Sequence, residues 1–493
     1  MAEGLGRVSL VGAGPGDPDL ITYKGRKLLA SADAILYDHL APESLLDLAP
    51  PHAERIYVGK KKSVHAFSQE EICAMMIDRA RRGLSVVRLK GGDPFIFGRG
   101  GEEIEALAEA GIPYEVVPGV TSPLGIAAYT GVPLTHRDHT KLVTFVTGHD
   151  ADGIDWSRVG QTETLVIFMG IHFIREITSE LMKYGRSPDT PAMCVRWGTR
   201  PDQHTITGTL ATIADQVQSD DIKPPATIII GEVVQLQAKL NWFERLPLFG
   251  QRIVVTRARD QAPELTDKFR ALGADVIEIP VIEIQPPADP GPLDRALAHL
   301  SDYDWIIFTS VNGVRHFLQR LDASPSDLRG LRARICAIGP ATRRAIEALH
   351  LKVDLMPKEY VAESLVAALK PHHLAGKRIL IPRAAVARDV IPVELTARGA
   401  SVDVVEAYRN VVPANATARL AQLSTADWIT FTSSSTVSNF VDLAAPPGTA
   451  RIASIGPVTS ETARSRGLHV DAEAQPYTID GLVQAILNAG PAR

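Results

Sequence analysis

Cysteine is scarce in this sequence. Only Cys73, Cys194 and Cys336 occur in 493 residues, far apart and never as a CxxC pair, which indicates neither a disulfide framework nor a cysteine-rich zinc site. No apolar run approaches the roughly 18–20 residues of a membrane-spanning helix, and the start of the chain lacks the charged and apolar regions of a signal peptide. We therefore expect a cytoplasmic protein with no membrane partner.

An excess of positive charge is also missing. The 52 Lys and Arg residues against 57 Asp and Glu residues give a net charge of -5. A general nucleic-acid binder usually shows a basic face or tail, so we expect no nucleic-acid partner. The length suggests about three or four domains at roughly 100–150 residues each.

Short apolar runs alternate with helix-like segments throughout the chain, which is the pattern of parallel α/β domains. Ser68 and Glu71 predict a capping box that opens a helix ending near Gly83. Ser122 followed by Pro123 predicts another helix start. The strands predicted in the first half span residues 8–11, 34–37, 86–89, 114–117 and 142–147.

A boundary near residues 246–250 separates this half from a second half with a weak internal repeat. DWIIFTSVNGV, from Asp304, recurs as DWITFTSSSTV from Asp427, and RICAIGP, from Arg334, recurs as RIASIGP from Arg451. Two copies predict two similar α/β lobes, since a solenoid would need more. Proline-containing segments near residues 285 and 408 mark the expected crossings between lobes. These crossings give a first lobe of residues 251–284 plus 412–493 and a second lobe of residues 285–408.

The stretch VVRLKGGDPFIFGRGGEE, residues 86–103, is unusually rich in glycine. Gly91-Gly92-Asp93 falls where a parallel strand ends, the edge at which open α/β sheets bind ligands. Glycine there lets a ligand approach the main chain, and Asp93 could hold hydroxyls or an amine. Glu102 and Glu103 are explained by a helix start, because carboxylates are favourable near the N-terminal end of a helix.

A second glycine loop, VGAGPGDP, follows the first strand and is similar to a dinucleotide fingerprint, with Asp38 as the candidate ribose acid. The required third glycine is missing. Pro15 and Pro18 delay the next helix to about Thr22, so that no helix N-terminus lies behind the loop to hold a pyrophosphate. A small adenosyl ligand is the favoured interpretation, and a turn built only for steric reasons is the alternative.

Together these segments carry a resemblance to a known family. VGAGPGDPDLIT, YDHL, VGKK, VRLKGGDPFIFGRGGEE, VVPGVTSPLGIAAYTGVPLTHRD, VTGHD, FMG and PATIIIGEVV resemble uroporphyrinogen-III C-methyltransferase, over residues 5–245. The resemblance implies a two-lobed tetrapyrrole methylase over residues 1–246, with lobes of about 1–135 and 136–246. It also implies methyl transfer from S-adenosylmethionine to two ring carbons of uroporphyrinogen III, which yields precorrin-2 and S-adenosylhomocysteine, and a homodimer formed through this half.

The resemblance also implies site residues. The family's proton acceptor falls on Asp38 and its proton donor on Lys60, although Lys60 could equally bind a substrate carboxylate. An acceptor is needed because the macrocycle must lose a proton after a pyrrole carbon attacks the sulfonium methyl. The implied cofactor contacts are Pro15, Gly91, Gly92, Asp93, Ile96, Thr121, Ser122, Met169 and Gly198. By charge, candidate partners for the acetate and propionate arms are Arg88, Lys90, Arg99 and Arg137, with solvated cations as the alternative.

Two features qualify this assignment. Arg196-Trp197-Gly198 stands where relatives often have an acidic residue before the glycine, which leaves a backbone contact at Gly198 credible and puts nearby side-chain roles in doubt. The run of His149 with Asp150, Asp152 and Asp155 could suggest a metal site, but a hydrated loop is the favoured interpretation, and the resemblance calls for no metal.

Several predicted strands of the second half end in hydroxyl or glycine positions just before a helix. Ordinary N-capping explains each of these positions taken singly. Because the same pattern recurs in both lobes, it also indicates that backbone N–H donors of several helix starts point into one cleft, where they would bind carboxylates. The sequence offers no nucleophile–base pair, so a binding role is favoured over acid–base work. These positions are Thr309, Ser310, Gly339, Thr342, Ser433, Gly456 and Thr459.

VVTRA, DWIIFTSVNGV, AIGPATRRAIE, ILIPRA, VEAYRN, FTSSSTV and SIGPVT resemble uroporphyrinogen-III synthase, over residues 251–488. The resemblance implies closure of linear hydroxymethylbilane with inversion of the last ring, which requires the chain to be held in a bent pose. Tyr408 falls on a family tyrosine that would help the terminal hydroxyl leave, with conformational control alone as the alternative. The candidate substrate contacts are Arg257, Thr309, Ser310, Thr342, Arg383, Ser433 and Thr459.

The whole sequence thus predicts an α/β chain, a two-lobed tetrapyrrole methylase followed by a two-lobed uroporphyrinogen-III synthase-like unit. Its expected ligands are tetrapyrroles, and its expected product stands at the branch toward sirohaem and cobalamin. Two alternatives remain. The first half could methylate RNA or a protein side chain, and the second half could bind a tetrapyrrole without converting it.

Overall fold

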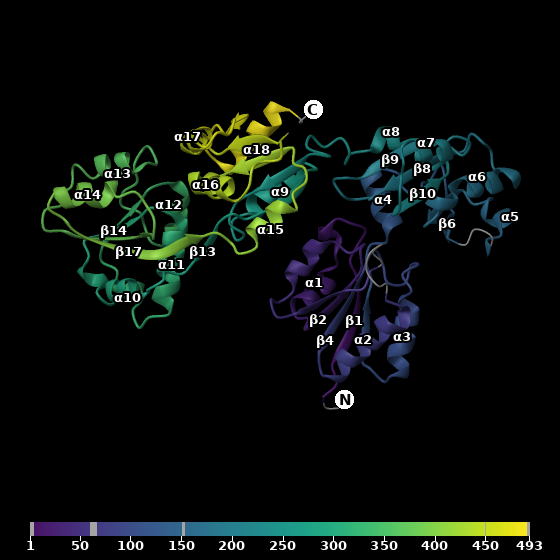
Figure 1. Cartoon of the computed structure of the whole chain (residues 1–493), viewed down its shortest axis with the longest axis horizontal. Coiled ribbons are helices and arrows are strands. Elements are labelled where there is room, and N and C mark those ends of the chain that lie inside the picture. The colour runs from purple at the N-terminus through teal and green to yellow at the C-terminus, as the bar shows by residue number, and fades with distance from the viewer. Residues whose placement is uncertain (1–3, 60–66, 150–152, 449, 491–493) are drawn as a thin grey trace. The chain divides into compact units, whose positions relative to one another are not determined.

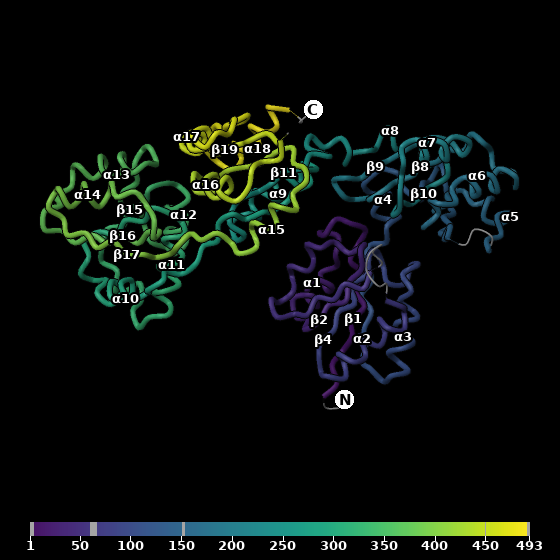
Figure 2. Tube along the Cα trace, in the orientation of Figure 1, coloured from purple at the N-terminus to yellow at the C-terminus, as the bar shows by residue number. Residues whose placement is uncertain are grey.

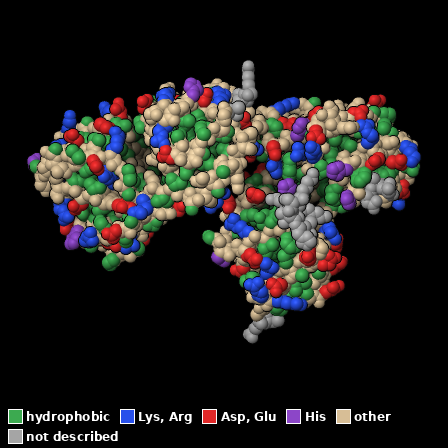
Figure 3. Space-filling model, viewed as in Figure 1, with side chains coloured by type: hydrophobic (Ala, Val, Ile, Leu, Met, Phe, Trp, Pro, Cys, Tyr) green, Lys and Arg blue, Asp and Glu red, His purple; other side chains and the backbone are tan. Residues whose placement is uncertain are grey.

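The computed structural model describes residues 4–59, 67–149, 153–448 and 450–490. The chain forms two compact units, one of Met1–Gln251 with Phe269–Asp275 and one of Arg252–Lys268 with Val276–Arg493 (Figures 1 and 2). The predicted α/β class is confirmed in both units. No helix in the described ranges is long and apolar enough to cross a membrane. Acidic and basic side chains are interspersed over the visible face of each unit (Figure 3).

The first lobe of the N-terminal unit is a five-stranded sheet in the order β3-β2-β4-β1-β5, with parallel neighbours. Each strand predicted here lies within two residues of the observed bounds, but Glu54–Tyr57 was missed because this half-exposed edge strand carries two charges in four residues. The strands are β1 (Arg7–Gly12), β2 (Ala34–Tyr37), β3 (Glu54–Tyr57), β4 (Ser85–Lys90) and β5 (Tyr114–Val117).

Helices cover both faces of this sheet (Figure 1). One face packs on α1 (Tyr23–Ala30) and the 3-10 helix η2 (Glu43–Leu48), and the other on α2 (Gln69–Arg81) and α3 (Gly100–Glu109). The predicted capping box of α2 is confirmed, since the Ser68 side chain accepts from Glu71 N–H and the Glu71 side chain accepts from Ser68 N–H. The helix α4 (Ser122–Thr130) follows β5 and begins at the predicted residue.

The second lobe of this unit departs from the parallel pattern that the sequence predicts. Its sheet has the order β6-β7-β10-β8-β9, and only β6 and β7 pair in parallel. The short connection between β8 and β9 forms a hairpin, which requires antiparallel neighbours. The strands are β6 (Val143–Thr147), β7 (Thr164–Phe168), β8 (Pro191–Arg196), β9 (His204–Thr209) and β10 (Ala226–Ile230), and the helices are α5 (Trp156–Val159), α6 (Ile174–Lys183), α7 (Ile213–Ser219) and α8 (Gln237–Leu240).

The C-terminal unit holds two five-stranded sheets, ordered β12-β11-β18-β19-β20 and β13-β17-β16-β14-β15. The first contains β11 (Arg252–Val255), β12 (Asp275–Glu278), β18 (Trp428–Phe431), β19 (Arg451–Ser454) and β20 (Ala472–Glu473), with α9 (Pro263–Ala271), α15 (Ala416–Ala421), α16 (Ser434–Leu443), α17 (Pro457–Ser465) and α18 (Ile479–Ala489). The second contains β13 (Glu283–Gln285), β14 (Trp305–Phe308), β15 (Arg334–Ala337), β16 (Arg378–Ala384) and β17 (Ser401–Val411), with α10 (Gly291–Ala298), α11 (Val311–Asp322), α12 (Pro340–Glu347), α13 (Ala362–Ala368) and α14 (Val390–Ala397).

The repeated motifs make the same contacts in both lobes of this unit. Asp304, before β14, accepts the Arg378 N–H of the neighbouring strand, and Asp427, before β18, accepts the Arg252 N–H in the same way. The crossings differ slightly from those expected. Glu283–Gln285 already pairs with β17, so the first crossing precedes residue 283, and Tyr408 lies inside the long strand β17 instead of in a linker.

Candidate active sites

Close contacts between glycine backbones join the loops at the carboxyl edge of the first sheet. A Cβ atom on Gly12 would lie 2.5 Å from Gly119 Cα, and one on Gly119 would lie 2.2 Å from Gly92 O. Gly92 N–H also donates to Gly14 O at 2.7 Å. A side chain at Gly12 or Gly119 would push the backbones apart, so these two glycines, with the hydrogen bond from Gly92 to Gly14, hold the loops after β1, β4 and β5 together.

Gly92 also leaves an open approach to the main chain. Its φ of +67° lies in the left-handed region, and an added Cβ would meet nothing closer than Ser122 N and Thr121 Cα, both at 3.7 Å. A Cβ on Gly91, by contrast, would lie 2.4 Å from Leu40 Cβ. The structure therefore brings the expected cofactor residues Gly92, Thr121 and Ser122 together around an open backbone surface.

Asp93 ties two of these loops to each other. Its Oδ1 accepts the Phe95 N–H at 2.8 Å, and its Oδ2 accepts the Gly119 N–H at 3.0 Å. Because the carboxylate is only half-buried, its remaining lone pairs can still accept from a ligand. Asp93 thus has a structural role that the sequence did not predict, alongside the expected cofactor contact.

Strained backbone concentrates beside this edge. Seven residues other than glycine have positive φ in the described part of the chain, and five of them lie in three loops of this unit: Phe97, Arg99, Met169, Trp197 and Thr199. Left-handed backbone is costly for such residues and is typical of functional sites. The cluster marks the loops after β4, β7 and β8 as parts of one site.

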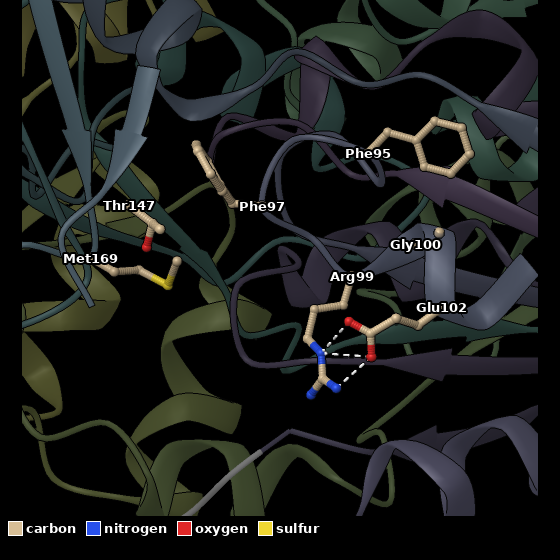
Figure 4. Close-up of a pocket in the computed structure, with 8 residues that line it drawn as sticks. Phe95, Phe97, Arg99, Gly100, Glu102, Thr147 and Met169 are labelled. Atoms are coloured by element: carbon tan, nitrogen blue, oxygen red, sulfur yellow. Dashed lines mark hydrogen bonds and ion pairs between the residues drawn. The ribbon is translucent and has the colours of Figure 1, made fainter. Parts of the chain in front are cut away.

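A pocket of about 500 Å³ opens between loops of the two lobes of this unit (Figure 4). Phe97 packs on Phe168, with ring centroids 4.8 Å apart. The Arg99 Nη2 lies 2.5 Å from Glu102 Oε2, and this pairing lowers the pKa of Glu102. The pocket therefore combines an apolar wall with one exposed ion pair. Its lining is Phe95, Phe97, Arg99, Gly100, Gly101, Glu102, Thr147 and Met169.

Other expected cofactor residues pack around α4. A Cβ on Gly125 would lie 2.5 Å from Pro15 Cγ, and one on Gly198 would lie 2.3 Å from Ile126 Cγ1. Gly198 is buried in this contact, and as a glycine it can offer only backbone atoms to a ligand. Ile96 is 38% exposed at the rim of the loop after β4.

Asp38 lies at the carboxyl end of β2 and is half-buried. Its Oδ1 accepts the Leu40 N–H at 3.1 Å, and its Oδ2 lies 3.5 Å from Arg88 Nη2. The neighbouring His39 contacts Trp197 of the second lobe edge to face, at 5.8 Å between ring centroids. The second predicted proton-transfer residue, Lys60, lies outside the described residues.

Two expected substrate partners are placed differently from the prediction. Arg88 and Lys90 are 5% and 4% exposed, and both bind the fully buried Glu103. This burial argues against direct contacts of their side chains with substrate arms, and it corrects the interpretation of Glu103 as a mere helix start. Burial lowers the pKa of Lys90, and the neighbouring Arg88 lowers it further. Arg99 and Arg137 are exposed and remain candidates.

No group of three potential metal ligands occurs among the described residues. In the aspartate-rich loop, Asp155 caps α5 by accepting the Ser157 N–H at 3.1 Å. Asp150 and Asp152 lie outside the described residues.

In the C-terminal unit, Tyr408 lies at the centre of a buried contact. Its hydroxyl is 3.1 Å from Ser310 Oγ, which also accepts the Gly313 N–H at 3.0 Å as the N-cap of α11. The His316 ring stacks on the Tyr408 ring at 5.7 Å. Burial raises the pKa of Tyr408, and the hydrogen bond between Tyr408 and Ser310 partly opposes this. Tyr408 is only 6% exposed.

The two lobes of this unit face each other through their carboxyl edges. Gln261 Nε2, after β11, donates to Asn312 Oδ1, in the first turn of α11, at 2.8 Å. Arg315 of α11 forms an ion pair with Asp260. The loops expected to bind substrate therefore lie at the junction of the two lobes.

The remaining candidates in this unit fall into two groups. Ser433 caps α16 in a capping box with Thr436, whereas Thr342 and Thr459 are buried in the first turns of α12 and α17. Thr309 is half-buried directly after β14. Ser310 and Ser433 thus cap their helices, as N-capping predicts, whereas in the described part of the chain α12 and α17 begin without a side-chain cap hydrogen bond.

The two candidate arginines differ in their partners. Arg257 is mostly buried, its Nη1 receives no hydrogen-bond partner among the described residues, and burial lowers its pKa. Glu264 Oε2 lies 3.8 Å from Arg257 Nη1. Arg383 is instead engaged, since it donates to Arg388 O at 3.0 Å and to Asp389 Oδ1 at 2.5 Å. Arg257 is the better placed of the two to receive a carboxylate.

Comparison with known proteins agrees with this division. The family of tetrapyrrole (corrin/porphyrin) methylases matches residues 7–214, and uroporphyrinogen-III synthase HemD matches residues 263–484. A porphyrin biosynthesis protein HemD from Ruminiclostridium josui is 36% identical over 98% of this chain and 98% of its own length. The chain belongs to both families. It is a fusion of a tetrapyrrole methylase domain and a uroporphyrinogen-III synthase domain, so both halves are enzyme domains of tetrapyrrole biosynthesis.

Two further relatives cover parts of the fusion. A uroporphyrinogen-III C-methyltransferase from Bacillus subtilis is 41% identical over 69% of this chain and 71% of its own. A solved structure of a uroporphyrin-III C-methyl transferase from Thermus thermophilus, complexed with S-adenyl homocysteine, is 43% identical, covers 47% of this chain and 100% of its own, and has a TM-score of 0.42.

Several residues of the methylase site were missed from the sequence. Phe95 and Phe97 line the pocket on either side of Ile96, the one residue of this triplet that was predicted. Glu103 was also missed as the buried partner of Arg88 and Lys90, although the sequence contains a signal for such a partner. Arg88 and Lys90 alternate with apolar residues inside a buried strand, and buried cations require an anion from elsewhere in the chain.

Proposed function

We propose that the synthase half closes hydroxymethylbilane to uroporphyrinogen III and that the methylase half then methylates this product twice to give precorrin-2. The observation that carries this proposal is the presence of both enzyme families in one chain, with a relative that matches it from end to end. The two reactions are consecutive, since the product of the first is the substrate of the second.

The residues present fit S-adenosylmethionine as the cofactor of the methylase half. Gly92 leaves its backbone open beside Thr121 and Ser122, and the adjoining pocket of about 500 Å³ has the size and apolar lining typical of small-molecule sites. When bound there, the cofactor supplies an electrophilic methyl group on a sulfonium. Met169 and Phe97 would shield this region from water.

Asp38 would accept the proton that the macrocycle loses after methylation. It lies at a strand end and is half-buried, its Oδ1 accepts the Leu40 N–H, and the Arg88 guanidinium lies 3.5 Å from its Oδ2. These contacts would orient the carboxylate before the substrate binds, which favours general base catalysis. The exposed Arg99 and Arg137 would bind carboxylate arms of the substrate by charge-assisted hydrogen bonds.

In the synthase half, Tyr408 would donate its proton to the terminal hydroxyl of the bilane, which then leaves as water. Because burial raises its pKa, the Tyr408 phenol stays protonated and available as an acid at neutral pH. The first turns of α11, α12, α16 and α17 and the partly unpaired Arg257 would hold the carboxylate arms and keep the bilane bent for closure.

Two experiments test the halves separately. Uroporphyrinogen III with S-adenosylmethionine should yield a product heavier by two methyl groups, and hydroxymethylbilane alone should yield the type III isomer. A methylated protein or RNA, with no methylated tetrapyrrole, would overturn the first assignment. We also propose that the chain is a homodimer through its methylase half, so that sedimentation should give twice the mass of one chain.

A second candidate for the C-terminal half is a module that binds a tetrapyrrole without converting it. The burial of Tyr408, at 6% exposure, favours this candidate, because a catalytic acid must reach its substrate. Calorimetric binding of hydroxymethylbilane without faster closure would support the module. Isomer-specific turnover would exclude it.

A further inference from the structure

A cluster of four charges lies beneath the methylase site. On β4, Arg88 and Lys90 point to the face that packs on α2 and α3, while Val87 and Leu89 point to the other face. The fully buried Glu103, in the first turn of α3, meets both cations. Asp38 completes the cluster at the end of the neighbouring strand β2.

The contacts of Glu103 are one-sided. Its Oε1 accepts from Arg88 Nε at 3.1 Å, from Lys90 Nζ at 3.0 Å and from Gln69 Nε2 at 3.0 Å. Its Oε2 is buried and receives no hydrogen bond from the described residues. A carboxylate held by three donors on one oxygen is firmly placed, and it fixes the Arg88 guanidinium in turn.

Arg88 joins this buried carboxylate to Asp38. Its Nε binds Glu103, its Nη1 donates to Leu89 O at 3.1 Å, and its Nη2 lies 3.5 Å from Asp38 Oδ2. The charges divide naturally into pairs, because Lys90 can balance Glu103 and leave the charge of Arg88 for Asp38. The planar guanidinium can make these contacts at once, which a lysine could not.

Stability alone does not explain the cluster. Burial of charge is costly, and well-packed apolar residues of similar volume are often as stable as a buried ion pair or more stable. An apolar pair at positions 88 and 90 would match the rest of β4, whose buried residues are otherwise apolar. Because this charge network ends on the half-exposed carboxylate of Asp38, we expect it to serve the function of Asp38.

We propose that Arg88 is a positioning residue for the proton acceptor Asp38, and that Glu103 and Lys90 hold Arg88 in place for this purpose. The inference rests on the proposed function, in which Asp38 removes a proton from the macrocycle. The hydrogen bond from Leu40 N–H to Oδ1 and the Arg88 charge 3.5 Å from Oδ2 orient the carboxylate before substrate binds.

A double-mutant cycle in the full chain tests this inference. Arg88→Gln, Asp38→Asn and the double variant are assayed for methylation of uroporphyrinogen III with S-adenosylmethionine. We expect Asp38→Asn to lower kcat by at least about 100-fold, the usual contribution of a general base, and Arg88→Gln to lower it by about tenfold or more. If Arg88 acts through Asp38, the double variant should be no slower than Asp38→Asn by more than about twofold.

The other readouts separate positioning from general damage. KM for both substrates should stay within about twofold of the wild-type value in every variant, because the base acts after binding. Arg79→Gln is the matched control, since Arg79 donates to both oxygens of Glu54 in the same lobe, away from Asp38. Its kcat should stay within about twofold of wild type. If Arg88→Gln does not fold, Arg88→Lys replaces it in the cycle, because it keeps the buried charge but cannot reach both carboxylates.

The outcomes are distinguishable. Losses that multiply in the double variant, or a wild-type kcat for the Arg88 variant beside a slow Asp38→Asn, would overturn the inference and leave the proposed function intact. A wild-type kcat for Asp38→Asn would overturn the role of Asp38 in the proposed function, and the inference with it.

Discussion

Gly91 and Gly92 follow the same strand, yet the structure gives them different tasks. Gly91 has no room for a side chain because Leu40 lies against it, whereas Gly92 has a left-handed backbone with open space beside it. The sequence predicted both as cofactor contacts, since neighbouring glycines cannot be told apart without the tertiary packing around them. We therefore assign the approach of S-adenosylmethionine to Gly92.

Gly92→Leu should weaken S-adenosylmethionine binding by at least about 50-fold, because the side chain would fill the approach to the backbone and distort the turn. Gly111→Leu is the matched control, since Gly111 has φ +68° and no atom within 4 Å of an added Cβ. Both variants should lose about 1–2 kcal/mol of stability from left-handed backbone, but only Gly92→Leu should lose the cofactor. Calorimetric titration measures the affinity, and a normal affinity for Gly92→Leu would contradict the placement.

Tyr408→Phe should slow formation of the type III isomer by about tenfold or more if the phenol acts as the acid. Tyr303→Phe is the control, because Tyr303 is equally buried in the same lobe and donates to Asp403 Oδ2 at 2.7 Å, away from Ser310. As the pKa of Tyr408 is raised from its ordinary value of 10.0, ionisation of this group should not slow the wild-type reaction below about pH 10. A Tyr408→Phe variant with full activity would leave ring closure to conformational control alone.

At the scale of single elements, local signals predicted helix starts well. Thr22, Ser68 and Ser122 each stand at or beside the observed start of a helix. Caps and first turns involve residues close in sequence, so they can be inferred without knowing the fold. The edge strand Glu54–Tyr57 and the antiparallel order of the second sheet could not be inferred in this way, because both depend on which strands become neighbours.

Two capping boxes in the chain allow a matched test of the synthase site. Ser433 opens α16 at the carboxyl edge of its sheet, and Ser68 opens α2 in the methylase half. Ser433→Ala and Ser68→Ala should each cost about 1 kcal/mol of stability from the lost cap. If Ser433 also contacts substrate, only its variant should raise KM for hydroxymethylbilane, by about fivefold. An unchanged KM would leave Ser433 as a cap alone.

At the scale of the whole molecule, motif order and spacing were enough to recognise two enzyme families in one chain, and the family comparisons confirm this division. The buried cluster around Glu103 could not be predicted from the sequence, because it joins residues from different strands and helices. Arg88 and Lys90 could be identified as unusual cations in a buried strand, but their anion could not. Arg88 and Lys90 were therefore predicted as substrate contacts, whereas in the structure they bind the buried Glu103.

The most direct test of the account supplies the purified chain with hydroxymethylbilane and S-adenosylmethionine together and determines product mass and ring isomer. We expect a type III product with two added methyl groups. A type I product, which forms by spontaneous closure, would contradict the synthase assignment. A type III product without added methyl groups would contradict the methylase assignment.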